Sequence, residues 1–346
     1  MSDTRPASTR RAGPRAGRLS NCDNWKICAG TSVNYRGGII RVSGNPIVWW
    51  PGQTNCKYTN KQPRRSCLPP RYSCLENREE HGLAIPYYHV DSFTGELFAG
   101  NPAGVCILSV FPADSIMLKI AAENRHSDTA FVIPRADGDF DLRWFTPKIE
   151  DDLCGHATLA SAYVLALRKH EMWPVRFHTR SGILTVAQNQ DNFEMDFPAR
   201  PPQPCETPVG LLPALSLKAA LVMKSPRDYL VVVDQAEQVR ALSPDIAALA
   251  KLDMGIGGGA IVTAPGEGDV DYVCRLFAPS AGIDEDPATG SIHCTLAPYW
   301  AGRLGKDTLR AQQLSARGGY MQSTIAGDRV KIAGRARLYL HGTLEL

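Results

Sequence analysis

From residue 85 onward the chain is a series of short apolar runs separated by glycine, proline and polar residues. Four of these runs in the first half have the composition of β-strands, and they span residues 87–93, 103–108, 130–133 and 140–145. Apolar residues at helical spacing lie between them, at residues 113–125 and 157–169. The pattern predicts a mixed α/β fold.

The second predicted helix has an unusual surface. Its sequence, ATLASAYVLALRK, is small or apolar nearly all the way round, and no charged side chain occurs before Arg168. A helix without a polar face must be buried on every side. We therefore expect a sheet to enclose it.

The second half of the chain repeats the order of elements found in the first. Residues 141–147 (DLRWFTP) lead through an acidic loop to residues 155–160 (GHATLA), and residues 271–279 (DYVCRLFAP) lead through another to residues 290–297 (GSIHCTLA). A strand with a glycine turn and an alternating hairpin follow in both halves. Coincidence is the alternative, but the shared order of four elements favours two pseudo-symmetric lobes, each a curved sheet around an apolar helix.

Residues 1–84 differ from the rest of the chain. They show no sustained periodicity, and residues 1–85 hold fourteen Lys and Arg against five Asp and Glu, whereas the remainder holds twenty-four against thirty. We expect a basic, disordered extension over residues 1–84, an N-terminal lobe over 85–200 and a C-terminal lobe over 201–346. The C-terminal strand is a candidate to complete the first lobe.

The ten cysteines do not form a disulfide framework in this interpretation. Five lie in the first quarter and five in the rest, so neither set pairs completely. Zinc is an alternative for the first set, but five and six residues separate Cys22 from Cys28 and Cys67 from Cys74, wider than the two to four of structural zinc sites. We expect no metal.

Charge and hydropathy exclude several classes of partner. No apolar run reaches the roughly 18 residues of a membrane span, and residues 1–19 lack the apolar core of a secretory signal. The basic stretch is loosely typical of a transit peptide, but Pro6, Gly13, Pro14 and Gly17 would interrupt its helix. RNA binding is possible for such an arm, although a solvated tail is commoner. We expect a cytoplasmic protein without a membrane or nucleic-acid partner.

Two glycine loops are the candidate ligand-binding elements. Cys154-Gly155-His156 and Thr289-Gly290-Ser291 each precede an apolar helix. If the lobes face each other, both helix starts point unpaired N–H groups into one cleft, where a carboxylate is a suitable ligand. Glycine allows close approach of the backbone. A purely structural glycine turn remains the alternative for each loop.

Carboxyl groups near these loops are candidates for proton transfer. Asp284, Glu285 and Asp286 lie together before the second loop, and their mutual repulsion would raise at least one pKa. Asp128 lies between a predicted helix and a predicted strand, where its side chain could reach the cleft. Helix capping is the alternative role for both.

Four long segments together resemble the PhzF family of phenazine-biosynthesis-like isomerases. They are DSFTGELFAGNPAGVCIL, LRWFTPKIEDDLCGHATLASAYVL, YVCRLFAPSAGIDEDPATGSIHCTLAPYW and SARGG. The resemblance covers the chain from about residue 85 to its end, and the segments are ordered and spread over both halves. Residues 1–84 have no counterpart in the family pattern, and an upstream misreading of the gene is one explanation.

The resemblance implies a diaminopimelate-epimerase-like fold, with the active site between two lobes. It also implies catalysis without a metal or organic cofactor, a small-molecule carboxylate as substrate, and a homodimer. By motif, Asp128 is the base that moves a proton between carbons of a cyclic carboxylic acid, with His156 and Asp286 assisting. Gly155, Gly290 and Ser291 are the substrate-binding positions in this interpretation.

The base itself departs from the family pattern. Ser127-Asp128-Thr129 stands where the family usually has Glu in the middle position, and Asp is shorter by one methylene, roughly 1.5 Å of reach. A misplacement of about 1 Å can lower a rate roughly a hundredfold. Glu123 lies inside the preceding helix, so it is no obvious replacement. The alternative function is a catalytically silent family member that binds a partner protein.

Two further residues receive non-catalytic interpretations. Related epimerases of this fold use a thiol on each side of the cleft, but the second loop offers no thiol before Cys294, so we expect Cys154 to fill space behind its loop. Arg317 could bind an anionic substrate, although a turn with the guanidinium in solvent is commoner. The leading hypothesis is a cofactor-independent isomerase that moves a proton and a double bond on a small carboxylic acid.

Overall fold

The computed structural model describes residues 34–36, 39–42, 45–47, 84–255 and 257–346. The chain divides into two compact units, Met1–Asn77 and Arg78–Leu346. In the first unit, β1 (Asn34–Arg36), β2 (Ile39–Val42) and β3 (Asn45–Ile47) pair antiparallel. Strands of three or four residues are too short to show a period of two in the sequence. The predicted disorder elsewhere in residues 1–83, and all five cysteines of that segment, lie outside the described residues.

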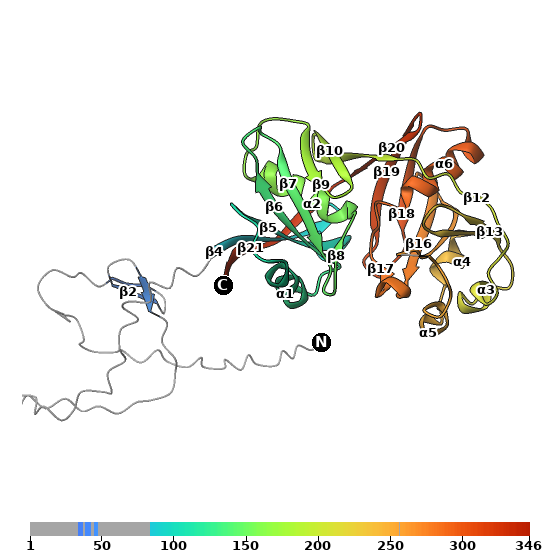
Figure 1. Cartoon of the computed structure of the whole chain (residues 1–346), viewed down its shortest axis with the longest axis horizontal. Helices are drawn as coiled ribbons and strands as arrows, with labels where there is room; N and C mark the ends of the chain where they lie inside the picture. The colour runs from blue at the N-terminus through green and yellow to red at the C-terminus, as the bar shows by residue number, and fades with distance from the viewer. Residues whose placement is uncertain (1–33, 37–38, 43–44, 48–83, 256) are drawn as a thin grey trace, which may run out of the picture. The chain divides into compact units, whose positions relative to one another are not determined.

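The second unit consists of two lobes of mixed sheet, coloured green and orange in Figure 1. The strands of the N-terminal lobe are β4 (Ala84–Ser92), β5 (Asn101–Ile107), β6 (Asp128–Pro134), β7 (Phe140–Phe145), β8 (Glu150–Asp151), β9 (Val175–Thr179), β10 (Gly182–Asn189), β11 (Asn192–Pro198) and β21 (Ala336–Glu345). Its helices are α1 (Asp114–Asn124) and α2 (Gly155–Leu167).

The C-terminal lobe repeats this arrangement with short helices added. Its strands are β12 (Gln203–Pro204), β13 (Leu221–Lys224), β14 (Tyr229–Val232), β15 (Ala260–Pro265), β16 (Tyr272–Ala278), β17 (Ile283–Asp286), β18 (Thr308–Gln313), β19 (Gly319–Ala326) and β20 (Arg329–Gly334). Its helices are α3 (Leu211–Ala214), α4 (Ala236–Arg240), α5 (Ile246–Leu249), the 3-10 turn η1 (Pro279–Ala281) and α6 (His293–Leu304).

Strand pairing gives the internal repeat a physical basis. In the N-terminal lobe β5 and β6 are parallel, β6 and β7 antiparallel, β7 and β8 antiparallel, and β7 and β9 parallel. The C-terminal lobe has the same sequence of pairings through β14, β15, β16, β17 and β18. The two lobes are therefore related by a pseudo-two-fold axis, as the repeated motifs predict.

The apolar helix α2 occupies the interior of its lobe. It contacts β4, β5, β6, β11 and β21, and ten of its thirteen residues are buried. Burying an apolar side chain contributes roughly 1.5–3 kcal/mol, so a helix apolar on every side gains most by lying inside a curved sheet. The prediction that a sheet encloses this helix is confirmed, although the helix begins at Gly155, two residues earlier than expected.

Strand pairing, a chain crossing and side-chain packing join the lobes. β11 pairs with β20, and the C-terminal strand β21 crosses back to pair with β4, which completes the first lobe. Phe93, at the end of β4, is fully buried. A methyl group on Gly290 or Gly334 of the other lobe would lie 2.9 Å or 2.6 Å from its ring. The ring therefore fits a slot that only glycine leaves open, and this contact fixes the cleft between the lobes.

Among the described helices, none is long and apolar enough to cross a membrane.

Candidate active site

The two loops that precede α2 and α6 are equivalent by strand register. Asp151 pairs with Trp144 across β7 and β8, and Asp286 pairs with Leu276 across β16 and β17. A glycine follows four residues after each aspartate, Gly155 in one lobe and Gly290 in the other. The two loops thus share the frame Asp-x-x-x-Gly at the same place in each lobe.

The two glycines bring the loops into direct contact. A methyl group added to Gly155 would lie 3.6 Å from the Gly290 Cα and 3.7 Å from the Ser291 nitrogen. The N–H groups of Gly155, His156 and Ser291 have no backbone acceptor within the described part of the chain. Free amides at the start of a helix favour an anion. These three amides, called the cleft amides below, can hold a carboxylate.

One helix start differs from the prediction. α2 begins at Gly155, but α6 begins at His293 rather than at Gly290. The intervening residues form a turn, in which the His293 N–H donates to the Gly290 carbonyl (3.1 Å) and the Cys294 N–H donates to the Ser291 carbonyl (3.2 Å). The turn still leaves the Ser291 N–H directed away from these bonds, so the second loop keeps its free amide.

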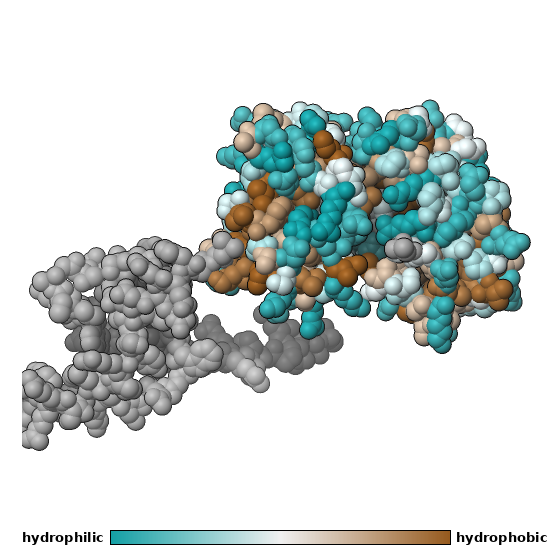
Figure 2. Space-filling model, viewed as in Figure 1, coloured by the Kyte–Doolittle hydropathy of each residue, from teal (hydrophilic) through white to brown (hydrophobic). Residues whose placement is uncertain are grey.

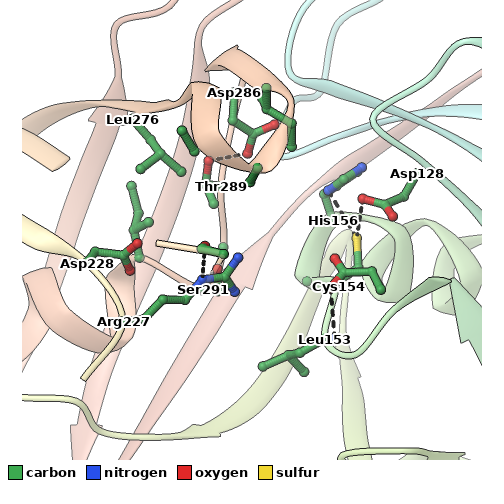
Figure 3. Close-up of a pocket in the computed structure, with 18 residues that line it drawn as sticks. Asp128, Leu153, Cys154, His156, Arg227, Asp228, Leu276, Asp286, Thr289 and Ser291 are labelled. Atoms are coloured by element: carbon green, nitrogen blue, oxygen red, sulfur yellow. Dashed lines mark hydrogen bonds between the residues drawn. The ribbon is translucent and has the colours of Figure 1, made fainter. Parts of the chain in front are cut away.

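All six predicted site residues line one open cleft between the lobes. Figure 3 shows Asp128 and His156 on one side of the cleft and Asp286 and Ser291 on the other. On the face shown in Figure 2 the surface is hollowed between the lobes, and mostly hydrophilic side chains border the hollow. Sequence elements far apart in the chain are therefore brought together as the repeat predicts.

Asp128 is the first residue of β6, and its side chain is almost completely buried, with 3% of the residue exposed. The Cys154 thiol donates to its Oδ2 (3.2 Å), whereas Oδ1 has no hydrogen-bond partner among the described residues. Burial raises the pKa of Asp128 well above its usual range, and the negative charges of Asp151 and Asp286 raise it further. This carboxyl group can therefore hold a proton at neutral pH.

His156 lies next to the same thiol. Its Nδ1 is 3.3 Å from the Cys154 Sγ, its Nε2 has no partner among the described residues, and the Ser92 hydroxyl donates to its backbone carbonyl (2.8 Å). Burial lowers the pKa of His156 to about 3, so the imidazole is neutral. Burial also raises the pKa of Cys154 well above its usual value. The thiol is thus a hydrogen-bond donor in the cleft wall, and it also packs in the hydrophobic core, as the space-filling interpretation expects.

Asp286 faces this group from the other lobe. The Asn101 amide donates to its Oδ1 (2.9 Å), and the Thr289 hydroxyl donates to its Oδ2. Burial raises the pKa of Asp286 to about 6, against the lowering effect of these two hydrogen bonds. Its proton affinity is therefore close to that required of an acid or base at neutral pH.

The cause of the raised pKa of Asp286 is not the one the sequence suggests. Side chains alternate along β17, so Glu285 points outward and forms a bidentate pair with Arg275 (2.7 and 2.9 Å), while Asp284 is exposed. Burial rather than repulsion within Asp284–Asp286 is the main cause. The nearby like charge is Asp151, from the other lobe.

Three charged cleft residues, Asp151, Arg227 and Asp228, were missed by sequence reasoning. Asp151 is the pseudo-symmetric counterpart of Asp286, and burial raises its pKa. Aligning DDLCGH with DPATGS over their glycines would have found it. Arg227, in the turn between β13 and β14, also lines the cleft. Nothing in the repeat points to Arg227, because the corresponding turn of the first lobe has a different length and sequence.

Arg317 lies elsewhere. Its guanidinium binds the buried Asp91 carboxylate (2.7 Å) and the carbonyls of Ala99 and Gly100 (3.0 and 2.8 Å). It therefore fixes the β4–β5 connection, and the predicted solvent exposure is wrong because Asp91 would otherwise be a buried unpaired charge.

One cluster of buried side chains has the donor atoms to bind a metal ion. Donor atoms of Asp128, Cys154 and His156 lie within 4.8 Å of one another. Metal binding requires the thiolate, and the raised pKa of Cys154 opposes its formation. Hydrogen bonding among the three groups is the better fit to this chemistry.

Comparisons with known proteins agree with this geometry. The family model described as phenazine biosynthesis-like protein matches residues 90–342. An uncharacterized isomerase of Pseudomonas aeruginosa is 50% identical over 265 residues, which cover 76% of this chain and 100% of that protein. An uncharacterized isomerase of Halalkalibacterium halodurans is 40% identical over 268 residues, with the same two coverages of 76% and 100%.

Solved structures support the fold. A PhzF-family phenazine biosynthesis protein from Enterococcus faecalis matches with a TM-score of 0.73 at 40% identity, covering 76% of this chain and 100% of that one. A hydroxyproline epimerase from Agrobacterium vitis shares the fold alone, with a TM-score of 0.52 at 12% identity over 76% of this chain and 91% of that one. The predicted epimerase-like architecture is confirmed. The chain therefore belongs to the phenazine biosynthesis-like (PhzF) family of isomerases.

Proposed function

We propose that this protein moves a proton, and with it a double bond, between carbons of a small carboxylic acid, without a cofactor. The observation that carries the proposal is Asp128, a buried carboxyl group in the cleft wall with one oxygen that has no partner among the described residues. A carboxyl group with a raised pKa can both remove and return a proton near neutral pH. Such a group has no evident structural purpose at the start of a strand.

In the proposed reaction the cleft amides hold the carboxylate of the substrate. Asp128 takes a proton from one carbon, so that its C–H bond breaks, the Asp128 O–H bond forms, and the electron pair is delocalised toward the substrate carboxylate. The amides stabilise this developing negative charge. The Asp128 carboxyl exchanges its proton with solvent and then delivers a proton to a different carbon, so that the Asp128 O–H bond breaks, the new C–H bond forms, the double bond moves and the carboxylate is restored. Asp286 and the neutral His156 lie where they can hydrogen-bond the substrate during the shift.

The short side chain of Asp128 limits where the reacting carbon can lie. Its Oδ2 is occupied by the Cys154 thiol (3.2 Å), so Oδ1 is the oxygen available to the substrate. The substrate must therefore approach β6 more closely than it would approach a glutamate. This geometry favours a substrate different from that of the usual Glu-bearing family members.

Solvent-deuterium incorporation into a panel of cyclohexadiene carboxylates tests the proposal. We expect Asp128→Ala and Asp128→Asn to lower incorporation by about 10²–10⁴, the usual contribution of a general acid or base. Glu123→Ala is the matched control, because Glu123 is exposed in α1, only five residues earlier. Equal incorporation by the parent and Asp128→Ala would remove Asp128 from the mechanism.

Asp128→Glu provides a second arm of the same experiment. A faster exchange in Asp128→Glu would show that the shorter side chain handicaps the reaction with that substrate. A slower exchange would show that the cleft is built for Asp. If no acid exchanges with the parent protein, the alternative of a catalytically silent binding protein replaces the isomerase proposal.

We also propose a homodimer, on the family resemblance, which light scattering after gel filtration would measure.

A further inference from the structure

We propose that the cleft contains a second anion-binding subsite, formed by Arg227, and that the substrate is therefore a dicarboxylic acid. This inference rests on the proposed function, in which the cleft amides hold the first carboxylate. It adds a second acidic group on the substrate, which the guanidinium of Arg227 would bind. No part of the PhzF motif identifies this residue.

The first observation is the unpaired guanidinium. Arg227 Nε donates to the Gly257 carbonyl (2.8 Å), and the guanidinium lies over Gly257, where a methyl group would be 3.7 Å from Nη2. Neither Nη1 nor Nη2 has a hydrogen-bond partner or a carboxylate within salt-bridge distance in the described part of the chain. The bond at Nε fixes the plane of the group and leaves the Nη1–Nη2 edge free. That edge matches a carboxylate in a bidentate geometry.

The second observation is that the turn carrying Arg227 is rigidly held. The buried Ser225 hydroxyl accepts from the N–H groups of Arg227 and Asp228 (3.3 and 2.9 Å). Asp228, also buried, accepts from the Gly259 N–H through its Oδ1 (3.0 Å), and Lys224 donates to the Arg227 carbonyl (3.2 Å). A solvated surface arginine does not require such support. A preorganised ligand-binding arginine does.

The third observation is the charge of the cleft. The lining residues include the carboxyl groups of Asp128, Asp151, Asp228 and Asp286, and Arg227 is the permanent cation among the lining residues that the structure describes. The positive charge of Arg227 lowers the pKa of all four, so it lies close to the reacting groups. Figure 3 shows its guanidinium directed into the space between the two lobes.

The cleft also continues beyond Arg227. Arg227 and Gly257 line both the inner cleft and its wider mouth. The mouth holds the cations Lys148 and Arg200 together with acidic residues, of which Glu150 is paired with Arg143 and Arg180. The side chain of Arg200 has no hydrogen bond or ion pair in the described residues. A ligand held at the cleft amides can therefore extend past Arg227 toward Arg200, which suits an acid with two separated carboxylates rather than one.

The competing explanation is that Arg227 only balances the negative charge of the four carboxyl groups that line the cleft. That role would affect every ligand equally and would shift the pH dependence without changing the preference for a second carboxylate. Selectivity between mono- and dicarboxylates therefore separates the two explanations. It also separates this inference from the isomerase proposal, because binding needs no turnover.

The test is calorimetric titration of the full-length protein, at low ionic strength, with benzoate, phthalate, isophthalate and terephthalate. These acids share one ring and differ in whether, and where, a second carboxylate is attached. We expect at least one dicarboxylate to bind about 10–100-fold more tightly than benzoate, the range for a charge-assisted pair. In Arg227→Gln that preference should fall below about threefold, with the affinity for benzoate unchanged.

Matched variants keep the result interpretable. Arg240→Gln removes the same charge from an exposed site on α4 and should retain the full preference. Arg227→Lys keeps the charge without the bidentate edge, so it should retain only part of the preference, and it replaces Arg227→Gln if that variant fails to fold. Arg200→Gln should weaken the binding of dicarboxylates by less than Arg227→Gln does.

Each contrary outcome has a distinct meaning. Equal affinities of the parent for benzoate and all three dicarboxylates would overturn the subsite and leave the isomerase proposal standing. A preference for dicarboxylates that survives Arg227→Gln would overturn the subsite in favour of the charge-balancing role. An equal weakening in the binding of all four acids would do the same. Absence of binding by all four acids to the parent would overturn the carboxylate-binding role of the cleft amides and the subsite with it.

Discussion

The two glycine loops of this protein share the frame Asp-x-x-x-Gly but differ in their side-chain chemistry. Asp151–Gly155 and Asp286–Gly290 occupy equivalent positions after equivalent strand pairs, and their glycines meet across the cleft. Cys154 and His156 stand in one loop where Thr289 and Ser291 stand in the other. In the proposed reaction, the shared frame duplicates the amides that would hold an anion, and the differing side chains would divide the proton transfers between the lobes.

The candidate base sharpens the contrast. Asp128 pairs with Ala103 at the start of β6. The next residue of β6 pairs with Phe145, and the first residue of β15 pairs with Phe277, which is the counterpart of Phe145. Gly259, directly before β15, is therefore the counterpart of Asp128. A two-thiol epimerase of this architecture would need a cysteine on each loop, and Thr289 replaces the second. A base on one lobe and acid partners on the other suit a proton shift on one face of the substrate.

The largest expected effect is the loss of the acid on the second loop. Asp286→Asn should lower deuterium incorporation by about 10²–10⁴, because an amide cannot exchange the proton that a carboxyl with a pKa of about 6 can. Incorporation into a substrate of the parent enzyme measures it. Glu285→Gln is the control, since Glu285 is bound to Arg275 outside the cleft. An Asp286→Asn rate within threefold of the parent would limit Asp286 to a structural role.

Adding a methyl group to the two loop glycines should affect the stability of the fold unequally. In Gly290→Ala the new Cβ would lie 2.9 Å from the buried Phe93 ring, so we expect a loss of about 1–3 kcal/mol in the free energy of unfolding. In Gly155→Ala the nearest atom is 3.6 Å away, so the fold should tolerate it. Urea unfolding of both variants measures the difference. Equal losses would show that the Phe93 slot does not distinguish the loops.

Asp286→Asn should also change the stability, in the opposite direction to its effect on rate. The pKa of Asp286 is raised from 3.8 to about 6 in the folded state, so its contribution to stability is present below pH 3.8 and is lost as the pH rises through 6. The Asn variant carries no such loss and should be more stable than the parent at pH 7, by about 1–3 kcal/mol. Thermal unfolding between pH 4 and 7 should show the gain shrinking toward pH 4, and a gain independent of pH would contradict the assignment.

The hydrogen bonds to the two carboxyl groups should have smaller effects. Cys154→Ala removes the donor to Asp128, and Thr289→Val removes the donor to Asp286. Each should change the exchange rate by about 3–10-fold, the worth of one net hydrogen bond. Cys154→Ser keeps a donor and should lie closer to the parent. A loss comparable to that of Asp128→Ala would instead make Cys154 a proton carrier.

The smallest expected change is a shift of the pH profile. Asp151 raises the pKa of Asp128 through its negative charge, so Asp151→Asn should lower that pKa. Asp128 acts as a base when ionised, and the fall in exchange rate at acidic pH should therefore move to lower pH. Asp269→Asn, at an exposed site outside the cleft, is the control. An unchanged acidic limb would show that the charge of Asp151 does not contribute to the raised pKa of Asp128.

Much of the fold could be predicted because local patterns repeat. The strand at residues 140–145 was predicted with its observed bounds, and the all-round apolar character of α2 required its enclosure. The glycine loops were found because the same sequence of elements occurs twice. The start of α6 was misplaced, since a turn and a helix have similar local sequence and differ only in whether the next hydrogen bonds continue.

The site could be predicted in part. Asp128, His156 and Asp286 could be named from motifs, and aligning the two loops would have found Asp151, but Arg227 could not be placed in the cleft from its neighbours in the chain. The cause of the pKa shift of Asp286 was also misassigned, because strand alternation turns Glu285 away and burial dominates. Burial depends on contacts between lobes, and no local window of sequence contains them.

The sequence by itself determined two lobes, a buried helix in the first lobe and two glycine loops, because periodicity and repetition are properties of neighbouring residues. Only the tertiary structure decided which carboxyl groups are buried together, that the Cys154 thiol faces Asp128, and that Arg227 enters the cleft with a free edge. The burial of these carboxyl groups depends on segments far apart in the chain meeting between the lobes, as Asn101 meets Asp286, and their energies are set by the water that this meeting excludes.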